Sequence, residues 1–440
     1  MRITITRTID GPDDLGGVNA LETLVREEGF ALMRELIGTL WQRLQEQSLR
    51  CPHCGSQDVE RCGHKPYQLL TAFGSVELPR QRVQCRACNA SSQPMDAWLK
   101  ELGEHRATWL VQELTCLAGA SWPYGDSEVI VARMLLGEVS HEQIRRVANA
   151  EGERVAEELE AEAQTVLEAP VFDEGEEDAR GLTGVLAGDW VRSRDTPEGM
   201  EAKVGVVYSG VERIGKNRRQ LVNRRSAATF QGSELLGKLV YAQASKLGVE
   251  RVGRLRLVGD GARWIDIVGD EHFARARRIL DLWHLERQLS RGLKAAIGDK
   301  AELARQRAEF GGLIRSGQVE PVLARLRALA EQQPTVGVGE GGESAVPAVP
   351  KELFATIRYI EGHRDAIVNY EAEMAAGEHV GSGAVEKAGD VVVNRRFKGR
   401  RGMRWRRRSA DGILALRILH LNGDWDAYWH RRREPQPTAA

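Results

Sequence analysis

Two pairs of cysteines constrain this chain more than any other feature of its sequence. They are Cys51-Pro-His-Cys54 and Cys85-Arg-Ala-Cys88, and 30 residues separate Cys54 from Cys85. A two-residue gap lets both thiolates of a pair reach one ion, and tetrahedral zinc needs four such soft ligands. The sequence therefore predicts a structural zinc site formed by these four cysteines, within a zinc ribbon at residues 51–98.

The segment between the two pairs has the pattern of a β-hairpin. Strand-like sequence runs through residues 67–84 and is interrupted at Gly74, a residue that favours turns. His53, Cys62 and His64 lie nearby, and replacement of one cysteine ligand by one of them is the alternative to the four-cysteine set. Disulfides are not expected, because the N-terminus lacks the basic flank and apolar core of an export signal.

Helical periodicity flanks the ribbon on both sides. Residues 1–50 are expected to form an N-terminal helical region, because apolar residues recur there at helical spacing. Residues 99–180 are expected to form a second helical region with a helix-turn-helix pattern and an acidic linker at its end. A helix-turn-helix can place a helix in the major groove of DNA, although any two-helix corner has this pattern.

Residues 181–284 change to an alternation of strands and helices. Three successive strands, a helix and then alternating strands and helices are the element order of an RNase H-like α/β domain, in which carboxylates on central strands perform phosphoryl chemistry. The strands are expected at residues 184–191, 203–210, 221–230, 255–258 and 278–282. The chain is therefore predicted to be a multidomain α+β protein that contains an α/β RNase H-like domain.

Three carboxylates occupy the positions that this chemistry requires. Asp189 lies in the first strand, Asp260 ends the fourth, and Glu386 lies early in a later helix. Two Mg²⁺ or Mn²⁺ ions ~3.5–4 Å apart need shared oxygen ligands to hold the attacking and leaving oxygens of a phosphodiester. These three residues are candidates for such a two-metal site, and the alternatives are an Asp that caps the turn after a strand and a Glu that complements the dipole of its helix. Asp173 is the alternative to Asp189.

A long helical segment separates the second acid from the third. Between Asp260 and Glu386 lie 125 residues, more than one helical connection needs. Residues 285–375 are therefore predicted to be a helical insertion with a flexible break at 333–350, which is rich in Gly, Pro and Val. Residues 376–433 would complete the α/β domain, and residues 434–440 would form a tail.

Positive and negative charges are concentrated in different segments of the chain. Lys and Arg total 62 and Asp and Glu total 63, but residues 381–408 carry ten cations against two acids, a balance of +8. Residues 151–180 carry twelve acids against two cations, a balance of −10. A solvated face is the ordinary explanation of one charge run, but a dense basic run with interleaved aromatic residues favours binding of a nucleic-acid backbone. The predicted DNA-binding residues are Arg395, Arg396, Lys398, Arg400, Arg401, Arg404, Trp405 and Arg406. A second basic cluster consists of Arg218, Arg219, Arg224 and Arg225.

Several stretches of sequence resemble one family of mobile-element proteins. They are Val258-Gly-Asp-Gly-Ala-Arg-Trp-Ile265, Arg278-Ile-Leu-Asp-Leu-Trp-His284, Gly381-Ser-Gly-Ala-Val-Glu386 and the run from Asn394 to Trp405. In these sequence motifs the chain is similar to the bacterial insertion-sequence transposases of the Kra-type family, which are relatives of the eukaryotic Mutator-like transposases. The resemblance covers roughly residues 51–429 and is most specific around Glu386.

The resemblance implies a DDE-type transposase with Asp189, Asp260 and Glu386 as its metal-binding triad. It also implies a role for Asp281-Leu-Trp-His284, which matches an Asp/Cys-x-x-His motif of Mutator-like and hAT-like relatives. His284 would orient the scissile phosphate or its surroundings, and a structural histidine at a strand-to-helix junction is the alternative. The chain departs from the family at Asp189, which is followed by Trp190 where members often have glycine.

The expected activity is metal-dependent DNA cleavage and strand transfer at terminal inverted repeats. The expected partner is double-stranded DNA, both element ends and target, and pairing of two ends implies a homodimer or a higher oligomer. The chain is expected to be cytoplasmic and nucleoid-associated, because no apolar run is long enough to span a membrane. Two alternatives remain open: a zinc-ribbon DNA-binding regulator with an inactive RNase H-like fold, and a structure-specific nuclease.

Overall fold

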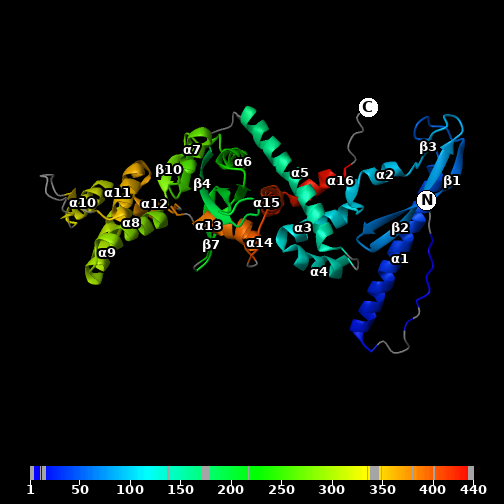
Figure 1. Ribbon diagram of the computed structural model, residues 1–440, viewed down its shortest axis with the longest axis horizontal. Coiled ribbons are helices and arrows are strands. Elements are labelled where there is room, and N and C mark those ends of the chain that lie inside the picture. Colours follow the sequence, from blue (N-terminus) through cyan, green and yellow to red (C-terminus); the bar gives the residue numbers. More distant parts are fainter. Residues whose placement is uncertain are drawn as a thin grey trace. The chain divides into compact units, whose positions relative to one another are not determined.

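The computed structural model divides the chain into two compact units (Figure 1). The first unit comprises Met1–Gly152 together with Asp426–Ala440, and the second comprises Glu153–Trp425. The residues that the structure describes are 4–9, 11, 16–135, 139–169, 178–216, 218–333, 335–336, 346–347, 349–378, 380–381, 383–399 and 402–434. Within these ranges, no helix is both long enough and apolar enough to cross a membrane.

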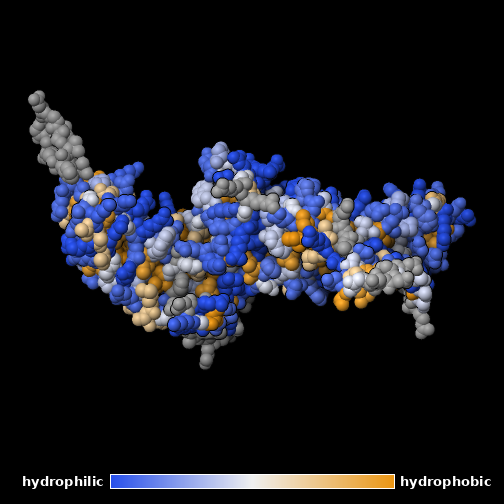
Figure 2. Space-filling model, turned by 90° about the horizontal axis from the view of Figure 1, so that it is seen from below, coloured by the Kyte–Doolittle hydropathy of each residue, from blue (hydrophilic) through white to orange (hydrophobic). Residues whose placement is uncertain are grey.

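Hydrophilic side chains cover most of the molecular face in Figure 2, and hydrophobic side chains appear there in scattered patches. Large hydrophobic side chains that are exposed include Val18 and Val25 in the N-terminal helix and Trp283 in the second unit. Single exposed apolar side chains of this kind are ordinary on a folded protein.

The first unit begins with a long helix packed on a β-hairpin. The hairpin pairs its strands antiparallel from Val59↔Cys85 to Thr71↔Gly74, so its first strand begins earlier than the sequence pattern indicated. Trp41, Leu69, Leu78 and Met95 form the core between helix and hairpin. The elements are α1 (Val18–Gln47), β1 (Val59–Thr71), β2 (Gly74–Cys85), β3 (Ser91–Ser92), α2 (Asp96–Lys100) and η1 (Gly103–His105).

Three further helices complete the N-terminal part of this unit. They are α3 (Trp109–Ser121), α4 (Tyr124–Leu135) and α5 (His141–Glu168), which runs on into the second unit. Val111, Val131 and Ile144 join the three helices in one hydrophobic core. The helices of the predicted helix-turn-helix are thus present, and residues 136–138 of their connection lie outside the described ranges.

The last helix of the chain belongs to the first unit, which differs from the predicted boundary of 376–433. In α16 (Trp425–Arg433), the Tyr428 hydroxyl donates to Glu151 Oε1 at 2.6 Å and Arg432 Nε donates to the same atom at 2.7 Å. Glu151 is only 3% exposed. A buried carboxylate needs charged and hydrogen-bonding partners, and α16 supplies them.

A five-stranded mixed sheet is the centre of the second unit. Its strand order is β10-β9-β4-β5-β8, in which β5 pairs antiparallel with β4 and β8, β9 pairs parallel with β4, and β10 pairs parallel with β9. Leu182, Leu186, Leu236, Val240 and Val268 pack the sheet against its helices. The elements are β4 (Asp178–Val191), β5 (Met200–Tyr208), β8 (Arg225–Thr229), α6 (Ser233–Ser245), β9 (Val252–Gly259), α7 (Arg263–His272) and β10 (Arg277–Leu280).

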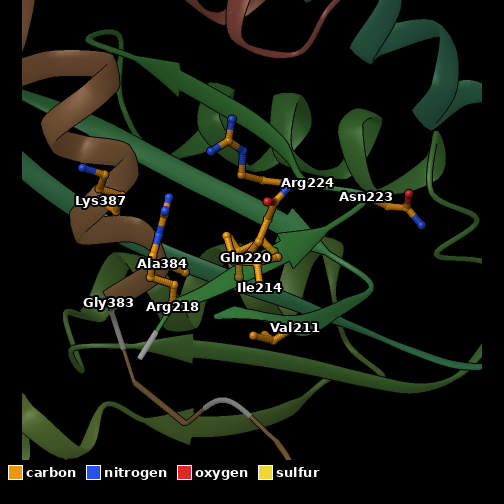
Figure 3. A pocket seen from close by; sticks show the side chains of 10 residues that line it. Val211, Ile214, Arg218, Gln220, Asn223, Arg224, Gly383, Ala384 and Lys387 are labelled. Atoms are coloured by element: carbon orange, nitrogen blue, oxygen red, sulfur yellow. The ribbon is translucent and has the colours of Figure 1, made fainter. Parts of the chain in front are cut away.

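The predicted third strand at 221–230 is divided into two. Asn223 adopts the left-handed conformation (φ 48°), and its Nδ2 donates to Ser209 Oγ at 3.0 Å. This turn ends β7 (Arg218–Val222), which pairs with β6 (Gly210–Gly215), and redirects the chain into β8, which pairs with β5. The β6–β7 hairpin therefore leaves the central sheet, and its residues face the helix that contains Ala384 and Lys387 (Figure 3).

The described part of residues 285–375, the segment predicted to be an insertion, is largely helical. Leu293, Leu326, Leu353 and Ile360 from three of its helices are fully buried. Most of the predicted break at 333–350 lies outside the described residues, and its short pieces β11 (Thr335–Val336) and β12 (Val346–Pro347) pair antiparallel. The helices are α8 (Leu282–Ala296), α9 (Lys300–Arg315), α10 (Val319–Glu331), α11 (Lys351–Gly362), η2 (Arg364–Ala366) and α12 (Tyr370–Ala375).

The second unit ends with helices that return to the central sheet. The first is short and continues directly into one turn of wider π-helix and then into a further helical turn. The elements are α13 (Gly383–Gly389), η3 (Asp390–Asn394), α14 (Arg395–Phe397) and α15 (Arg407–Leu421).

Candidate active site and metal centre

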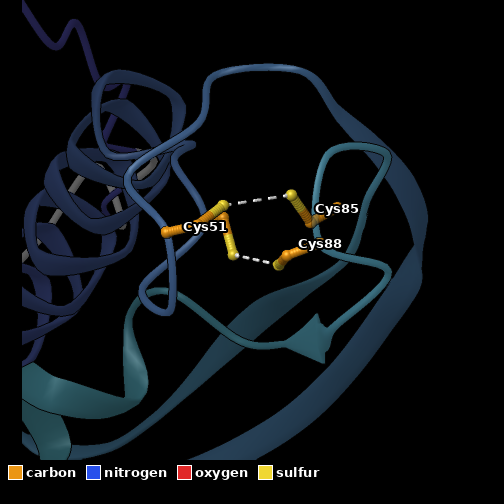
Figure 4. Close-up of side chains that lie close together, drawn as sticks. Cys51, Cys85 and Cys88 are labelled. Atoms are coloured by element: carbon orange, nitrogen blue, oxygen red, sulfur yellow. Dashed lines mark hydrogen bonds between the residues drawn. The ribbon is translucent and has the colours of Figure 1, made fainter.

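The four predicted zinc ligands meet at one point in the first unit. Their sulfur atoms all lie within 4.8 Å of one another, and the side chains point toward each other from two loops (Figure 4). Cys51 Sγ lies 3.6 Å from Cys88 Sγ, and Cys54 Sγ lies 3.6 Å from Cys85 Sγ. Tetrahedral zinc with Zn–S bonds of ~2.3 Å places its sulfurs ~3.8 Å apart, so the cluster fits such an ion.

The thiols of the cysteine site differ in their pKa: that of Cys85 is lowered, whereas those of Cys54 and Cys88 are raised because contacts with neighbouring thiols and burial outweigh their backbone hydrogen bonds. The backbone of Cys88 hydrogen-bonds to Cys85 Sγ and lowers the pKa of that thiol to about 7. Thiolate is the form of cysteine that binds zinc. All six cysteines are free of disulfides, as the sequence predicted, and Cys62 is exposed outside the cluster.

In the second unit, Asp189, Asp260, Glu386 and His284 line one cavity of about 240 Å³. Asp189 lies in β4, Asp260 follows β9, His284 is in α8 and Glu386 is in α13. The first two carboxylates come together because β4 and β9 are parallel neighbours in the sheet. The structure thus gathers the four residues to which sequence analysis assigned catalysis, whereas Asp173 lies outside the described residues.

Asp189 forms an ion pair with a residue of the basic segment. Lys398 Nζ lies 2.5 Å from Asp189 Oδ1, and the Trp190 backbone N–H donates to the same oxygen at 2.8 Å. The sequence predicted that Lys398 binds DNA and gave no indication of this pairing. Lys398 therefore neutralises one of the three carboxylates in the structure.

Asp260 is held by the helical insertion. Its Oδ1 accepts from the Ala262 N–H at 2.9 Å, which fixes the turn after β9, and its carbonyl accepts from the Tyr359 hydroxyl at 2.6 Å. Gly261 has φ +83°, and a Cβ there would lie 2.8 Å from His363 Nε2. The turn therefore needs glycine, and α11 braces it. Tyr359 and His363 carry no motif, so the sequence did not reveal them.

His284 is tied to a buried carboxylate. Asp281 is completely buried, accepts from the His284 backbone N–H at 3.1 Å, and lies 2.5 Å from His284 Nδ1. The hydrogen bond to Asp281, with further attraction from Asp260 and Glu386, raises the pKa of His284. The pairing occupies Nδ1 and leaves Nε2 as the ring nitrogen available to a ligand.

A buried arginine stabilises the turn that follows the helix carrying Glu386. The buried Arg417 of α15 donates from Nε to the Val392 carbonyl at 2.6 Å and also hydrogen-bonds to the Val391 carbonyl. These carbonyls belong to the π-helical turn that follows α13. Burial lowers the pKa of Arg417 to about 10. Arg417 thereby holds the turn that fixes the end of the Glu386 helix.

The basic segment is divided between surface and interior. Arg395, Lys398, Arg404 and Arg406 are exposed, while Arg400 and Arg401 lie outside the described residues. Arg396 and Trp405, both predicted to bind DNA, are instead buried at 1% and 6% exposure. The Arg396 guanidinium lies 4.6 Å from the centre of the Trp405 ring, and Phe397 packs on the same ring. These two residues therefore stabilise the domain rather than present themselves to DNA.

The carboxylates are not gathered as closely as the cysteines. Within the described residues, the cysteine cluster is the group of three or more potential ligands that converges on one point. The three acids share a cavity, but Asp189 is held by Lys398. Their oxygen atoms are nevertheless the hard donors that Mg²⁺ and Mn²⁺ prefer.

Comparisons with known proteins leave the family of this chain open. No family model and no curated protein matches it. Among solved structures, it is similar to the Drosophila P element transposase strand transfer complex, with 9% identity and a TM-score of 0.22, over 73% of this chain and 80% of that chain. A likeness at this level does not establish a shared fold or activity.

Proposed function

We propose that this protein is a DDE-type transposase that cleaves DNA and transfers the cleaved strand. The observation that carries the proposal is the cavity shared by Asp189, Asp260, Glu386 and His284. These residues come from one strand, the turn after the neighbouring strand and two helices, and 125 residues separate Asp260 from Glu386. Such convergence of acids from distant parts of a chain is typical of a catalytic centre and not of a turn or a helix cap.

The topology of the sheet supports an RNase H-like domain. Three antiparallel strands followed by two parallel ones, in the order β10-β9-β4-β5-β8, follow the element order that the sequence predicted for this fold. The first acid lies on the central strand and the second at the end of its parallel neighbour. The resemblance of the sequence around Glu386 to Kra-type insertion-sequence transposases leads to the same family.

Asp189, Asp260 and Glu386 would hold two Mg²⁺ or Mn²⁺ ions, which supply activation of water and neutralisation of charge on the phosphate. Before they do so, the Asp189 carboxylate must part from Lys398. His284, fixed by Asp281, would donate from Nε2 to a non-bridging phosphate oxygen. Lys398 would then remain beside the phosphate as a counter-charge.

The reaction proceeds in two displacements at phosphorus. Water attacks the phosphodiester at the element end, the P–O bond to the 3′-oxygen breaks, and a free 3′-hydroxyl and a 5′-phosphate result. The 3′-hydroxyl then attacks a phosphodiester of target DNA, forming one P–O bond as another breaks. No covalent protein–DNA intermediate is needed. We assign recognition of the inverted repeats to the first unit, with its zinc ribbon and helices, and pairing of two ends to a dimer or larger assembly.

Strand transfer by the full-length protein tests this function directly. The substrate is DNA carrying the ends of the element that encodes the protein, incubated with target plasmid and Mg²⁺ or Mn²⁺. Wild-type protein is expected to join the ends to the target, while Asp260→Asn and Glu386→Gln bind the ends without cutting them. Joining at near wild-type rate by either variant would overturn the triad.

The outcome also separates transposition from the two alternatives. A nuclease would cut without joining, and an inactive regulator would bind without cutting. The DNA that flanks the gene provides an independent test. Terminal inverted repeats bounded by short direct repeats are expected on both sides, and their absence would favour a regulator or a nuclease.

A further inference from the structure

A second and larger cavity adjoins the same helix that carries Glu386. It has a volume of about 700 Å³ and lies between the β6–β7 hairpin and α13 (Figure 3). Ala384 and Lys387 of α13 line this cavity, whereas Glu386 and Gly389 line the carboxylate cavity. One helix therefore contributes different faces to the two cavities and separates them.

The lining of this second cavity is basic. Arg218, Arg224 and Lys387 contribute cations, Gln220 and Asn223 contribute amides, and the described residues that line it include no carboxylate. Val211, Ile214 and Leu221 form an apolar floor. Five side chains that can donate hydrogen bonds around one hollow match a ligand with several anionic oxygens.

The two arginines of the hairpin cavity are available to a ligand. In the described part of the chain, the guanidinium groups of Arg218 and Arg224 have no ion-pair or hydrogen-bond partner. Neighbouring arginines differ in this respect. Arg213 donates to the Gly215 carbonyl at 3.0 Å, and Arg225 pairs with Asp424. The arginines that face the cavity are thus those whose charge is left for an outside anion.

We propose that this cavity binds the sugar-phosphate backbone of the DNA strand whose scissile bond lies in the carboxylate cavity. The inference rests on the proposed function for the identity of the ligand as DNA. A helix with its side chains is ~10–12 Å across, and one strand of a duplex advances ~3.4 Å per phosphate. The contact therefore falls about three nucleotides from the scissile phosphate. The β6–β7 hairpin acts as a clamp that sets the direction in which the strand crosses α13.

Salt dependence of DNA binding tests the clamp without any chemistry. Full-length protein is titrated with a short fluorescein-labelled duplex of arbitrary sequence in EDTA at several salt concentrations. Each phosphate contact contributes about 0.9 to the slope of log K against log salt, so Arg218→Gln/Arg224→Gln is expected to lower the slope by about 1.8. Arg213→Gln removes one charge from the same hairpin outside the cavity and is the matched control. An equal loss per charge in Arg213→Gln would overturn the site, since it would show only general attraction.

The position of the contact is tested with neutral phosphates. A methylphosphonate placed about three nucleotides from the cleavage position is expected to weaken binding of wild-type protein and to leave the double variant unaffected. Equal weakening of both proteins would overturn the assigned position. Pyrophosphate is the competitor that tests for a small-molecule site: displacement of the duplex at micromolar concentration would overturn the DNA proposal.

The two proposals fail in different ways. Asp260→Asn, which lies outside this cavity, is expected to keep the wild-type salt slope while losing cleavage. A normal slope in the arginine variant together with normal cleavage would reject the clamp and leave the transposase assignment standing. If the arginine variant lowered the salt slope but the wild-type protein never cut DNA, the clamp would stand and the transposase assignment would be rejected.

Discussion

Lys398 Nζ lies 2.5 Å from Asp189 Oδ1, so a lysine of the basic segment pairs with one of the three carboxylates that line the cavity. The two residues are 209 positions apart in the sequence. In the proposed function, a metal ion at Asp189 would compete with Lys398 for this carboxylate.

Replacement of Lys398 by alanine is expected to tighten Mn²⁺ binding in the absence of DNA. An exposed ion pair contributes about 0.2–1 kcal/mol, so its loss favours the metal by about 1.4-fold to 5-fold. Electron paramagnetic resonance of free Mn²⁺ measures the affinity. Arg395→Ala, which removes an exposed cation paired with Asp390, is the control and should change little. Weaker Mn²⁺ binding in Lys398→Ala would contradict this competition.

The zinc site predicts one bound zinc per chain. Cys51→Ser or Cys85→Ser should lose the ion, because each removes one of four converging ligands. Metal content by mass spectrometry measures the result. Cys62→Ser changes an exposed cysteine of the same hairpin outside the cluster and should keep zinc. Full zinc content in both ligand variants would exclude the four-cysteine site.

Loss of the Arg417 side chain is expected to destabilise the second unit. Arg417→Met removes charged hydrogen bonds to the Val391 and Val392 carbonyls, each worth about 1.5–3 kcal/mol. Urea unfolding measures the free energy. Arg305→Met removes a solvent-exposed pair with Glu302 and should cost no more than about 1 kcal/mol. Equal effects of the two substitutions would show that Arg417 does not brace the turn.

The stability contributed by His284 is expected to depend on pH. Its pKa is raised by Asp281, so the imidazolium is favoured in the folded state. The contribution is therefore fully present below the unfolded pKa of about 6.5 and is lost as pH rises through the higher folded value. Thermal midpoints of wild type and His284→Asn in EDTA should differ more at acidic than at alkaline pH. If the difference in thermal midpoint between the two proteins grew as pH rises, the pKa of His284 would be lowered in the folded protein and not raised.

Features that depend on local sequence were predictable. The spacing of Cys51, Cys54, Cys85 and Cys88 specified a metal cluster, and the structure gathers their sulfurs within 4.8 Å. The strand pattern located Asp189 and Asp260 on elements that prove to be neighbours. Both inferences rest on short-range geometry, which the order of residues encodes directly.

Features that depend on which side chains are buried, or on contacts between distant parts of the chain, were not predictable from the sequence. Arg396 and Trp405 have the composition of a DNA-binding surface, yet they pack on each other in the core. The split of the strand at Asn223 depends on a left-handed residue and a hydrogen bond to Ser209, which no periodicity reveals. Tyr359 and His363 brace the turn at Asp260 from about one hundred residues away, with separations of 99 and 102 positions.

The bond between Glu151 and the last helix has a consequence for how the chain is made. The partners of this buried carboxylate, Tyr428 and Arg432, lie 277 and 281 residues later. During synthesis, the first unit must therefore wait, incomplete, until the whole second unit has left the ribosome. The first unit is therefore completed only after the second, and a translation product interrupted before Tyr428 would lack these partners of Glu151 in the unit that contains the cysteine cluster.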